Sequence, residues 1–268
     1  SGNSKEVLNA LLHWNKQHHV EIRYETRVIE ILTENNCVNG VKVTHLENTY
    51  SIATKSVCIC TGGKTFPSTG STGDGYHLAQ TLGHTITPLK PALVPLLTDH
   101  AIAPKLQGVS LQNVCVSCWV DEKKQLEKTG DLLFTHFGLS GPVAINSSRY
   151  IAEQIQLQKK VKVHIDMHPT IDEITLDRTL IDGLNTHGKM ILKNYMKLWM
   201  PAALTTVCGE FMEIDIEKNC CDVNAKERKN FRTFLKALPI HITGTRPFKE
   251  AMITVGGIST DEINSKTM

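Results

Sequence analysis

The sequence lacks any long hydrophobic run. No apolar stretch approaches the roughly 20 residues that a membrane-spanning helix needs, and the first residues carry no apolar core typical of a secretory signal. We therefore expect no membrane partner and a cytoplasmic protein. The sequence also begins without methionine and ends within a polar stretch, which favours a fragment of a longer chain.

An excess of charge of one sign is lacking as well. The chain has 29 Lys and Arg against 27 Asp and Glu, a net charge of +2, and only 6% aromatic residues. Nucleic-acid-binding domains commonly carry a clustered excess of cations, and single-strand binders add aromatic side chains. The sequence shows neither pattern, so we expect no nucleic-acid partner.

Metal and disulfide frameworks have little support. Most of the eight cysteines lie in apolar or strand-like runs, which predicts buried free thiols in a reducing compartment. Cys115 and Cys118 have the spacing of a zinc pair, but in an alternating strand they would face opposite sides. No second pair or paired histidine follows at finger spacing. We predict no metal site.

Hydrophobic periodicity predicts a mixed α and β chain of one to two domains. Asn3 and Glu6 resemble a capping box ahead of a first helix. Residues 20–24 alternate as a strand, a small antiparallel meander follows up to residue 55, and residues 57–60 predict a buried strand.

The character of the sequence changes at Pro88, Pro91 and Pro95, which indicate a crossing into a second domain. Beyond them the pattern predicts strands first and helices afterwards. The expected strands span residues 109–120, 132–134 and 161–165, a tight turn at 138–142 precedes a helix, helices dominate 171–238, and a last strand spans 251–255.

The most informative stretch is residues 57–83, where the apolar run is followed by Gly62, Gly63, Gly70, Gly73 and Gly75 and then by a helical pattern. A strand, a glycine-rich loop and a helix can cradle a phosphate or another polar cofactor group. An ordinary glycine-rich βα loop is the alternative.

A P-loop is a poor match to this stretch. The sequence Gly63-Lys64-Thr65 would need a glycine where Cys58 stands, and Phe66-Pro67 occupies the place where the helix should begin.

The paired motifs Thr61-Gly62-Gly63 and Thr72-Gly73-Asp74-Gly75 resemble those of FAD proteins of the fumarate-reductase and glutathione-reductase superfamily. Four longer blocks together resemble one bacterial family, the aminoacetone-oxidase-like NAD(P)/FAD-dependent oxidoreductases, which includes a bile-acid enone reductase. In chain order these blocks are PSTGSTGDGY (67–76), PALVPL (91–96), DLLFTHFGLSGP (131–142) and TVGGI (254–258).

The resemblance implies a multidomain α/β or α+β fold. Residues 1–90 and 246–268 would form part of a Rossmann-like, FAD-binding domain of the glutathione-reductase type. Residues 91–245 would form an inserted β-barrel and helical domain. The parent would be an oxidoreductase that uses FAD, with NAD(P)H as a candidate electron donor, on a small organic substrate.

The resemblance also implies a set of cofactor-binding residues. Those that would approach FAD are Thr61, Gly62, Gly63, Thr72, Gly73 and Asp74. Val28 would lie near the adenine through its backbone, and Gly256 and Gly257 would lie near the flavin. No catalytic residue follows from the motifs. Lys64 and Tyr76 flank the loop and are the first to examine, against the alternative of a structural or exposed role.

The sequence departs from that family in one respect. The opening G-x-G-x-x-G fingerprint with its acidic ribose ligand does not occur, and the family's closing segment would lie beyond Met268. We therefore expect a flavoprotein parent, and a chain that by itself is inactive and binds FAD weakly or not at all. A non-enzymatic binding module built on a translation-factor-like barrel, and a nucleotide-phosphate binder through residues 62–75, remain as alternatives.

Overall fold

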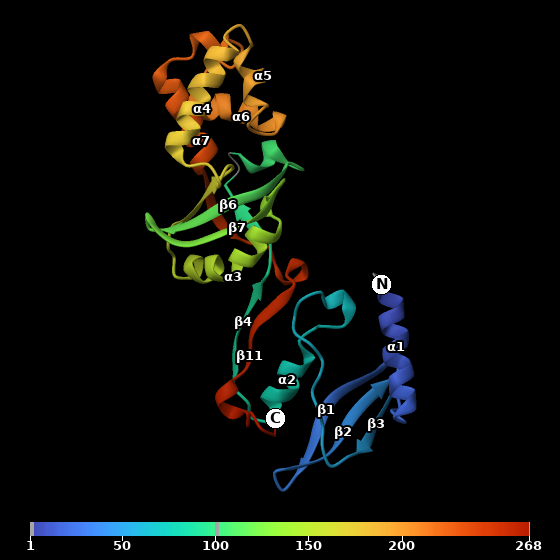
Figure 1. Ribbon diagram of the computed structural model, residues 1–268. Coiled ribbons are helices and arrows are strands. Elements are labelled where there is room, and N and C mark those ends of the chain that lie inside the picture. Colours follow the sequence, from blue (N-terminus) through green and yellow to red (C-terminus); the bar gives the residue numbers. More distant parts are fainter. Residues whose placement is uncertain (1–2, 100–101, 268) are drawn as a thin grey trace. The chain divides into compact units, whose positions relative to one another are not determined.

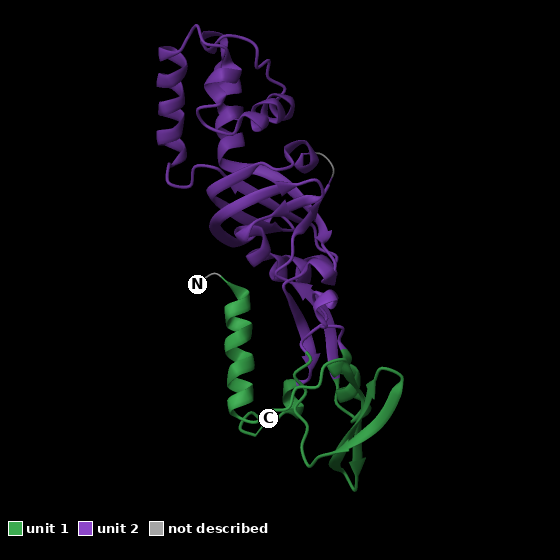
Figure 2. Cartoon of the chain, turned by 90° about the vertical axis from the view of Figure 1, so that its right-hand side faces the viewer, with its two compact units in different colours: residues 1–61, 74–85, 260–268 green, residues 62–73, 86–259 purple. Residues whose placement is uncertain are grey.

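The computed structural model describes residues 3–99 and 102–267. The chain divides into two compact units, which Figure 1 shows by element and Figure 2 by colour. Unit 1 comprises the chain up to Thr61, Asp74–Thr85 and the residues from Thr260 on. Unit 2 comprises Gly62–Gly73 and Ile86–Ser259. Each unit is described by itself below.

Unit 1 holds the predicted first helix and the predicted meander. Asn3 caps α1 (Ser4–Gln17), because its Oδ1 accepts a hydrogen bond from the backbone N–H of Lys5 at 3.1 Å. The strands β1 (Thr26–Glu34), β2 (Cys37–His45) and β3 (Asn48–Ala53) form an antiparallel sheet in sequential order. The second helix, α2, spans Asp74–Thr81. The glycine-rich stretch therefore does lead into a helix, as predicted.

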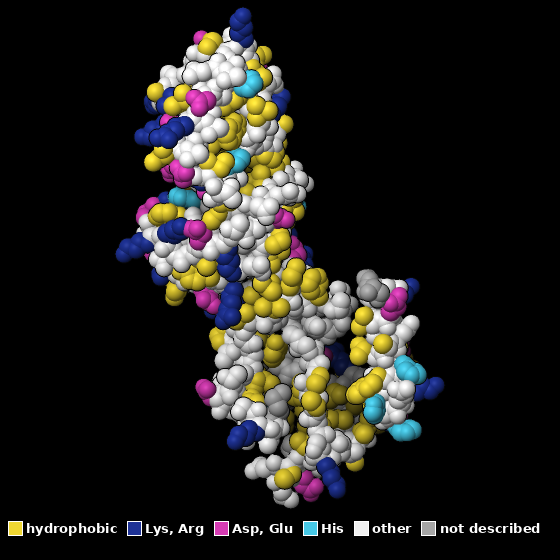
Figure 3. Space-filling view, in the orientation of Figure 1, with side chains coloured by type: hydrophobic (Ala, Val, Ile, Leu, Met, Phe, Trp, Pro, Cys, Tyr) yellow, Lys and Arg dark blue, Asp and Glu magenta, His cyan; other side chains and the backbone are white. Residues whose placement is uncertain are grey.

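Unit 1 buries little apolar surface among its described residues. Its buried hydrophobic side chains are Ile31, Val43, Leu78 and Ala79. Helix α1 has no buried residue, and hydrophobic side chains gather along it in the space-filling view (Figure 3). The large apolar side chains of α1 that are more than half exposed are Val7, Leu8, Leu11 and Trp14.

Two predicted strands of unit 1 are wrong. Residues 20–23 and 57–60 lie outside every strand, Tyr24 lies in a turn, and no strand among the described residues pairs with any of them. Residues 57–60 are also not buried, and Cys58 and Cys60 point to the same side with their Sγ atoms 3.3 Å apart. Alternation and apolarity predicted these strands, but a strand also requires a neighbouring strand with which it can pair.

Unit 2 is built on a closed barrel in the order β10-β5-β8-β7-β6-β9. In β6 the alternating Val114, Val116, Cys118 and Val120 are buried, which confirms the predicted strand. The barrel strands are β5 (Leu96–Thr98), β6 (Ser110–Val120), β7 (Lys123–Thr135), β8 (Gly138–Ser140), β9 (Val161–Asp166) and β10 (Leu238–Thr245). Helix α3 (Pro142–Gln156) begins at Pro142, as the tight turn before it predicts.

Two further strands of unit 2 form an antiparallel ribbon of their own. Strand β4 (Ile86–Ala92) pairs with β11 (Ile253–Ile258), from the Ile86 and Ile258 pair to the Ala92 and Ile253 pair. The segment that enters the barrel and the segment that leaves it therefore run side by side.

Four helices of unit 2 follow β9 in sequence, as predicted, but the barrel strand β10 comes after them and was not predicted. They are α4 (Glu173–Thr186), α5 (Leu192–Met196), α6 (Ala202–Met212) and α7 (Ala225–Ala237). Asn224 and Glu227 form a capping box at the start of α7. Lys236 joins α7 to the end of β9 through an ion pair with Asp166, with Nζ and Oδ2 2.6 Å apart. Barrel and helices share one hydrophobic core, which includes Leu180, Phe234 and Ile165.

The cysteines are all free, but the prediction that they are buried is only partly correct. Cys118, Cys208 and Cys220 are buried, and Cys115 is half-buried. Four are exposed: Cys37, Cys58, Cys60 and Cys221. The described residues contain no cluster of three metal-ligating side chains, and none of the helices described has the length and hydropathy to cross a membrane.

Candidate cofactor site

Asp74 stands at the first position of α2 and is held by Arg27 of β1. The guanidinium donates two hydrogen bonds to the carboxylate, from Nε to Oδ2 at 2.9 Å and from Nη2 to Oδ1 at 3.0 Å. The Arg27 side chain is 69% exposed, so the pair contributes little to stability. Its planar, two-pronged geometry instead fixes the orientation of the carboxylate. A negative charge in the first turn is also favoured by the helix dipole.

A small pocket lies beside this ion pair. It has a volume of about 120 Å³ and is lined by Arg27, Val28, Ile29, Asp74, His77 and Leu78. The structure thus brings together Val28 and Asp74, two of the residues that the sequence predicts for the cofactor site. Pockets that enclose a whole organic ligand commonly measure 300 to 1,000 Å³, so this one can receive only a portion of a dinucleotide.

Thr61 packs directly on the first turn of α2. A Cβ atom added to Gly75 would lie 2.3 Å from Thr61 Oγ1 and 2.9 Å from Ile59 Cγ2, closer than non-bonded atoms approach. Gly75 therefore lets residues 59–61 pass against the helix. This close approach, rather than conformational freedom, explains the last glycine of the Thr72-Gly73-Asp74-Gly75 motif.

The glycine-rich loop between Thr61 and Asp74 belongs to unit 2. Gly62 and Gly73 adopt left-handed backbone conformations, with φ of 73° and 91°, which glycine adopts without strain. After Gly63, the N–H of Lys64 donates to Thr254 Oγ1 of β11 at 2.8 Å. Within unit 2, then, the residues next to Gly62 and Gly63 are attached to the strand that carries Gly256 and Gly257.

Gly256 and Gly257 form a bulge in the ribbon of β4 and β11. Gly256 has a φ of 89°, and a Cβ atom there would lie 2.3 Å from the carbonyl oxygen of Pro88. The N–H of Gly257 donates to Thr87 Oγ1 at 3.0 Å. The bulge accounts for both glycines structurally, since neither position accepts a side chain without strain or collision.

Lys64 and Tyr76 show no arrangement typical of a catalytic group. The Lys64 ammonium lies 5.4 Å from the centre of the Phe248 ring, a cation–π contact. Tyr76 is half-buried on α2. Both positions fit the structural alternative stated for them.

The sequence missed Arg27 and His77. Arg27 is separated from Asp74 by 47 residues in the chain, and no motif surrounds it. The available signal was its position immediately before Val28 on a predicted strand.

The residues present fit one part of an FAD molecule. Asp74 offers an oriented carboxylate that can accept hydrogen bonds from hydroxyl groups, and the Arg27 guanidinium suits a phosphate. The pocket is too small for more than an edge of the cofactor.

Comparison with known families identifies the chain. The family described as HI0933-like protein barrel and H2TH domain matches residues 90–253, which is more than half of the sequence. The chain belongs to the HI0933-like family. This family is part of the FAD-dependent oxidoreductase superfamily, and the match covers the barrel and the helices of unit 2.

Three curated relatives of the HI0933-like chain are enzymes by name. The ribosomal RNA dihydrouridine synthase of Escherichia coli (strain K12) is 27% identical over 224 residues, which cover 82% of this chain and 52% of that protein. The synthase of the same name from Haemophilus influenzae is 28% identical over 220 residues, 80% of this chain and 50% of that protein. The 3-dehydro-bile acid delta(4,6)-reductase of Clostridium scindens is 26% identical over 212 residues, 79% of this chain and 52% of that protein.

The chain spans about half the length of these relatives. Their names support the resemblance to flavin-dependent oxidoreductases and to a bile-acid reductase. They do not support aminoacetone oxidase in particular.

Proposed function

We propose that this chain is the central part of an FAD-dependent oxidoreductase that reduces a carbon–carbon double bond conjugated with a carbonyl group. Dihydrouridine is the reduced form of uridine, and a delta(4,6)-reductase is named for the double bonds that it reduces. These names supply a reaction class in common, although one belongs to an RNA enzyme and the other to a bile-acid enzyme. We propose a small organic substrate, NAD(P)H as the electron donor and a cytoplasmic location for the parent.

The observation that supports FAD as the cofactor is the two-pronged ion pair between Arg27 and Asp74 of the Thr72-Gly73-Asp74-Gly75 motif. In the proposed site Asp74 accepts hydrogen bonds from hydroxyl groups of the cofactor, and Arg27 fixes the carboxylate so that both of its oxygens are oriented before binding. Thr61 is held beside them because Gly75 leaves room for it. When bound, the flavin supplies the transfer of a hydride to the substrate.

The test uses the full-length parent purified from cells. We expect a bound flavin absorbance and oxidation of NADH or NADPH that depends on an α,β-unsaturated carbonyl compound. Asp74→Asn removes the negative charge and should weaken FAD binding about tenfold, equivalent to about 1.4 kcal/mol. Asp261→Asn is the matched control, because Asp261 is an exposed carboxylate of unit 1 outside the pocket.

Two outcomes would contradict the proposal. A colourless parent that cannot be reconstituted with FAD would contradict the assignment of FAD as the cofactor. If the Asp74→Asn parent bound FAD as tightly as the Asp261→Asn parent, Asp74 would not be part of the FAD site. For the present chain alone we propose weak or undetectable FAD binding, and stoichiometric binding in a fluorescence titration would show that the described residues suffice.

A further inference from the structure

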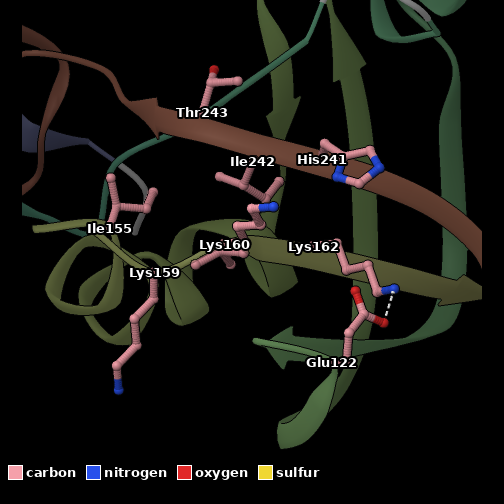
Figure 4. Close-up of a pocket in the computed structure, with 9 residues that line it drawn as sticks. Glu122, Ile155, Lys159, Lys160, Lys162, His241, Ile242 and Thr243 are labelled. Atoms are coloured by element: carbon pink, nitrogen blue, oxygen red, sulfur yellow. Dashed lines mark hydrogen bonds and ion pairs between the residues drawn. The ribbon is translucent and has the colours of Figure 1, made fainter. Parts of the chain in front are cut away.

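Outside the pocket beside Asp74, chemically active side chains gather in a charged hollow of unit 2 and in a thiol pair of unit 1. The hollow has a volume of about 250 Å³. Figure 4 shows its Lys162 turned toward Glu122, with which it forms an ion pair, so these two charges already have partners within the chain. The thiols belong to Cys58 and Cys60, which are hydrogen-bonded to each other with their Sγ atoms 3.3 Å apart.

Cys58 and Cys60 lie on the same side of their segment because its side chains alternate. Ile59 lies between them and Thr61 follows them, and both of these face Gly75 of α2. A Cβ atom added to Gly75 would lie 2.9 Å from Ile59 Cγ2 and 2.3 Å from Thr61 Oγ1. The two cysteines therefore point away from the helix, and both are exposed. Packing on α2 fixes one side of the segment, and the other side presents two neighbouring thiols.

The pair differs from the other cysteines of the chain. Among the eight cysteines, all of which the structure describes, only Cys58 and Cys60 have a second thiol within hydrogen-bonding distance. Cys118 is buried, and burial raises the pKa of its thiol to about 11, which keeps it protonated and unreactive. Cys221 is exposed, but its Sγ donates to Asp222 Oδ1 at 3.7 Å rather than to a thiol.

The two thiols do not ionise together. The hydrogen bond with Cys58, and then the charge of Cys58, raise the pKa of Cys60. One thiol therefore stays protonated while its neighbour, as a thiolate, can attack a disulfide. A thiol beside the attacking one can then resolve the mixed disulfide, which is the arrangement typical of redox-active cysteines. Since no third metal-ligating side chain joins the pair within the described part of the chain, the arrangement favours dithiol chemistry over a metal centre.

We propose that Cys58 and Cys60 form a dithiol site that reacts with small-molecule disulfides, of the class of oxidised glutathione, and closes into an intramolecular disulfide. This modification goes beyond the proposed oxidoreductase function and does not require bound flavin. The site lies directly before the Thr61-Gly62-Gly63 motif in the sequence.

The reaction is a thiol–disulfide exchange in two steps. In the first, the thiolate of one cysteine attacks a sulfur atom of the small disulfide, a protein–glutathione disulfide forms, and one glutathione thiolate leaves. In the second, the other cysteine loses its proton and attacks the mixed disulfide, which expels the second glutathione thiolate. The two protein thiols are oxidised, the small disulfide is reduced to two thiols, and the two protons pass to the leaving thiolates.

The intramolecular disulfide is strained and is therefore reversible. A backbone whose side chains alternate in this way advances about 3.3 Å per residue, so Cα atoms two residues apart lie about 6.6 Å apart. Disulfides rarely span more than about 6.8 Å between Cα atoms. Strained or exposed disulfides are the labile ones. We therefore expect a dithiol when reduced thiols are in excess and a disulfide when small disulfides accumulate.

The test exposes this chain, first fully reduced, to mixtures of oxidised and reduced glutathione, followed by acid quenching, alkylation, trypsin and mass spectrometry. Trypsin cleaves after Lys55 and Lys64, and the resulting peptide 56–64 contains Cys58 and Cys60 and no other cysteine. With oxidised glutathione at about 0.1 mM, the intramolecular disulfide of this peptide should exceed its mixed disulfide at least tenfold, because a tethered thiol has an effective concentration in the millimolar range or above. An excess of reduced glutathione should restore the doubly alkylated peptide.

Substitutions separate the pair from single thiols. Cys60→Ser and Cys58→Ser each leave one thiol without a resolving partner, so the mixed disulfide with glutathione should become the main oxidised form of peptide 56–64. Cys37→Ser is the matched control, because Cys37 is another exposed cysteine of unit 1, and this variant should behave like the unsubstituted chain. Circular dichroism should show that every variant remains folded.

The proposal fails if peptide 56–64 of the folded, unsubstituted chain stays doubly alkylated in oxidised glutathione, or if its mixed disulfide predominates. It also fails if Cys37→Ser abolishes the oxidised form, since Cys37 would then be the partner thiol. A disulfide that survives an excess of reduced glutathione would overturn reversible exchange and make the bond a structural one.

Discussion

Unit 1 and unit 2 differ in the interactions that stabilise their helices and strands. In unit 2, barrel strands and helices contribute to one continuous core. In unit 1, four hydrophobic side chains are buried among the described residues, and α1 buries none. The helix cap of Asn3, the turns of the meander and the Arg27–Asp74 ion pair are local or polar features. Burial therefore dominates the stability of unit 2, whereas local interactions define the elements of unit 1.

The largest effect should come from the core of unit 2. Leu180 of α4 is fully buried, so Leu180→Ala leaves a cavity and should lower the free energy of unfolding by about 2–5 kcal/mol. Urea denaturation followed by circular dichroism measures this. Leu198→Ala is the control, since Leu198 is 66% exposed. Equal losses in the two variants would contradict the core described here.

The next effect should come from the closest contact in unit 1. Gly75→Ala places a methyl group against Thr61 Oγ1 and Ile59 Cγ2, and overpacking of this kind costs about 1–3 kcal/mol. We expect residues 59–61 to detach from α2 and become sensitive to limited proteolysis. Adding Thr61→Ala should restore part of the loss, because it removes the nearest atom. Gly188→Ala should be tolerated, since its new Cβ would meet nothing closer than 3.5 Å.

A smaller effect should depend on pH and on His164 of β9. Burial, and then the charge of Lys162, lower the pKa of His164 below its ordinary value, although Glu122 opposes the shift. The unfolded chain therefore takes up this proton at higher pH than the folded chain does. The contribution of neutral His164 to the free energy of unfolding is fully present above about pH 6.5, the ordinary histidine pKa. It is lost as the pH falls through the lowered pKa of the folded chain.

The measurement is the urea midpoint between pH 7.5 and pH 5. His164→Gln should flatten the decline relative to the unsubstituted chain. His187→Gln, at the end of α4, should leave the decline unchanged. A decline that is the same in all three proteins would assign the pH dependence to other groups.

The smallest effect should come from α1. Leu11 is 56% exposed, so Leu11→Ala should change the unfolding free energy of this chain by less than about 0.5 kcal/mol. A loss of 2 kcal/mol or more, which is typical of buried leucine, would show that α1 is covered in solution. That result would remove the contrast between the units.

The sequence predicted helices and strands correctly where the local pattern agrees with the packing. The alternation of Val114, Val116, Cys118 and Val120 predicted β6, and Pro142 after a tight turn predicted the start of α3. The pattern failed at residues 57–60, because it reports extended, apolar backbone but not whether a neighbouring strand pairs with it. The meander, whose strands pair with their neighbours in sequence, was predictable for the same reason.

The candidate site shows the same limit. Motif resemblance pointed to Asp74 and Val28, which the structure places around one small pocket. It could not point to Arg27, since an ion pair across 47 residues leaves no local pattern.

The pairing of Ile86 with Ile258 has a consequence for how the chain folds. Closing a long flexible loop costs entropy that grows with its length. Here the two ends of the segment from Ile86 to Ile258 are joined by the hydrogen bonds between β4 and β11. Once unit 2 has folded, the segment acts on the flanking chain as a short hairpin would. If the segment is an insert, as we propose, this pairing would let a host fold gain or lose it at one point with little change to the host's own contacts.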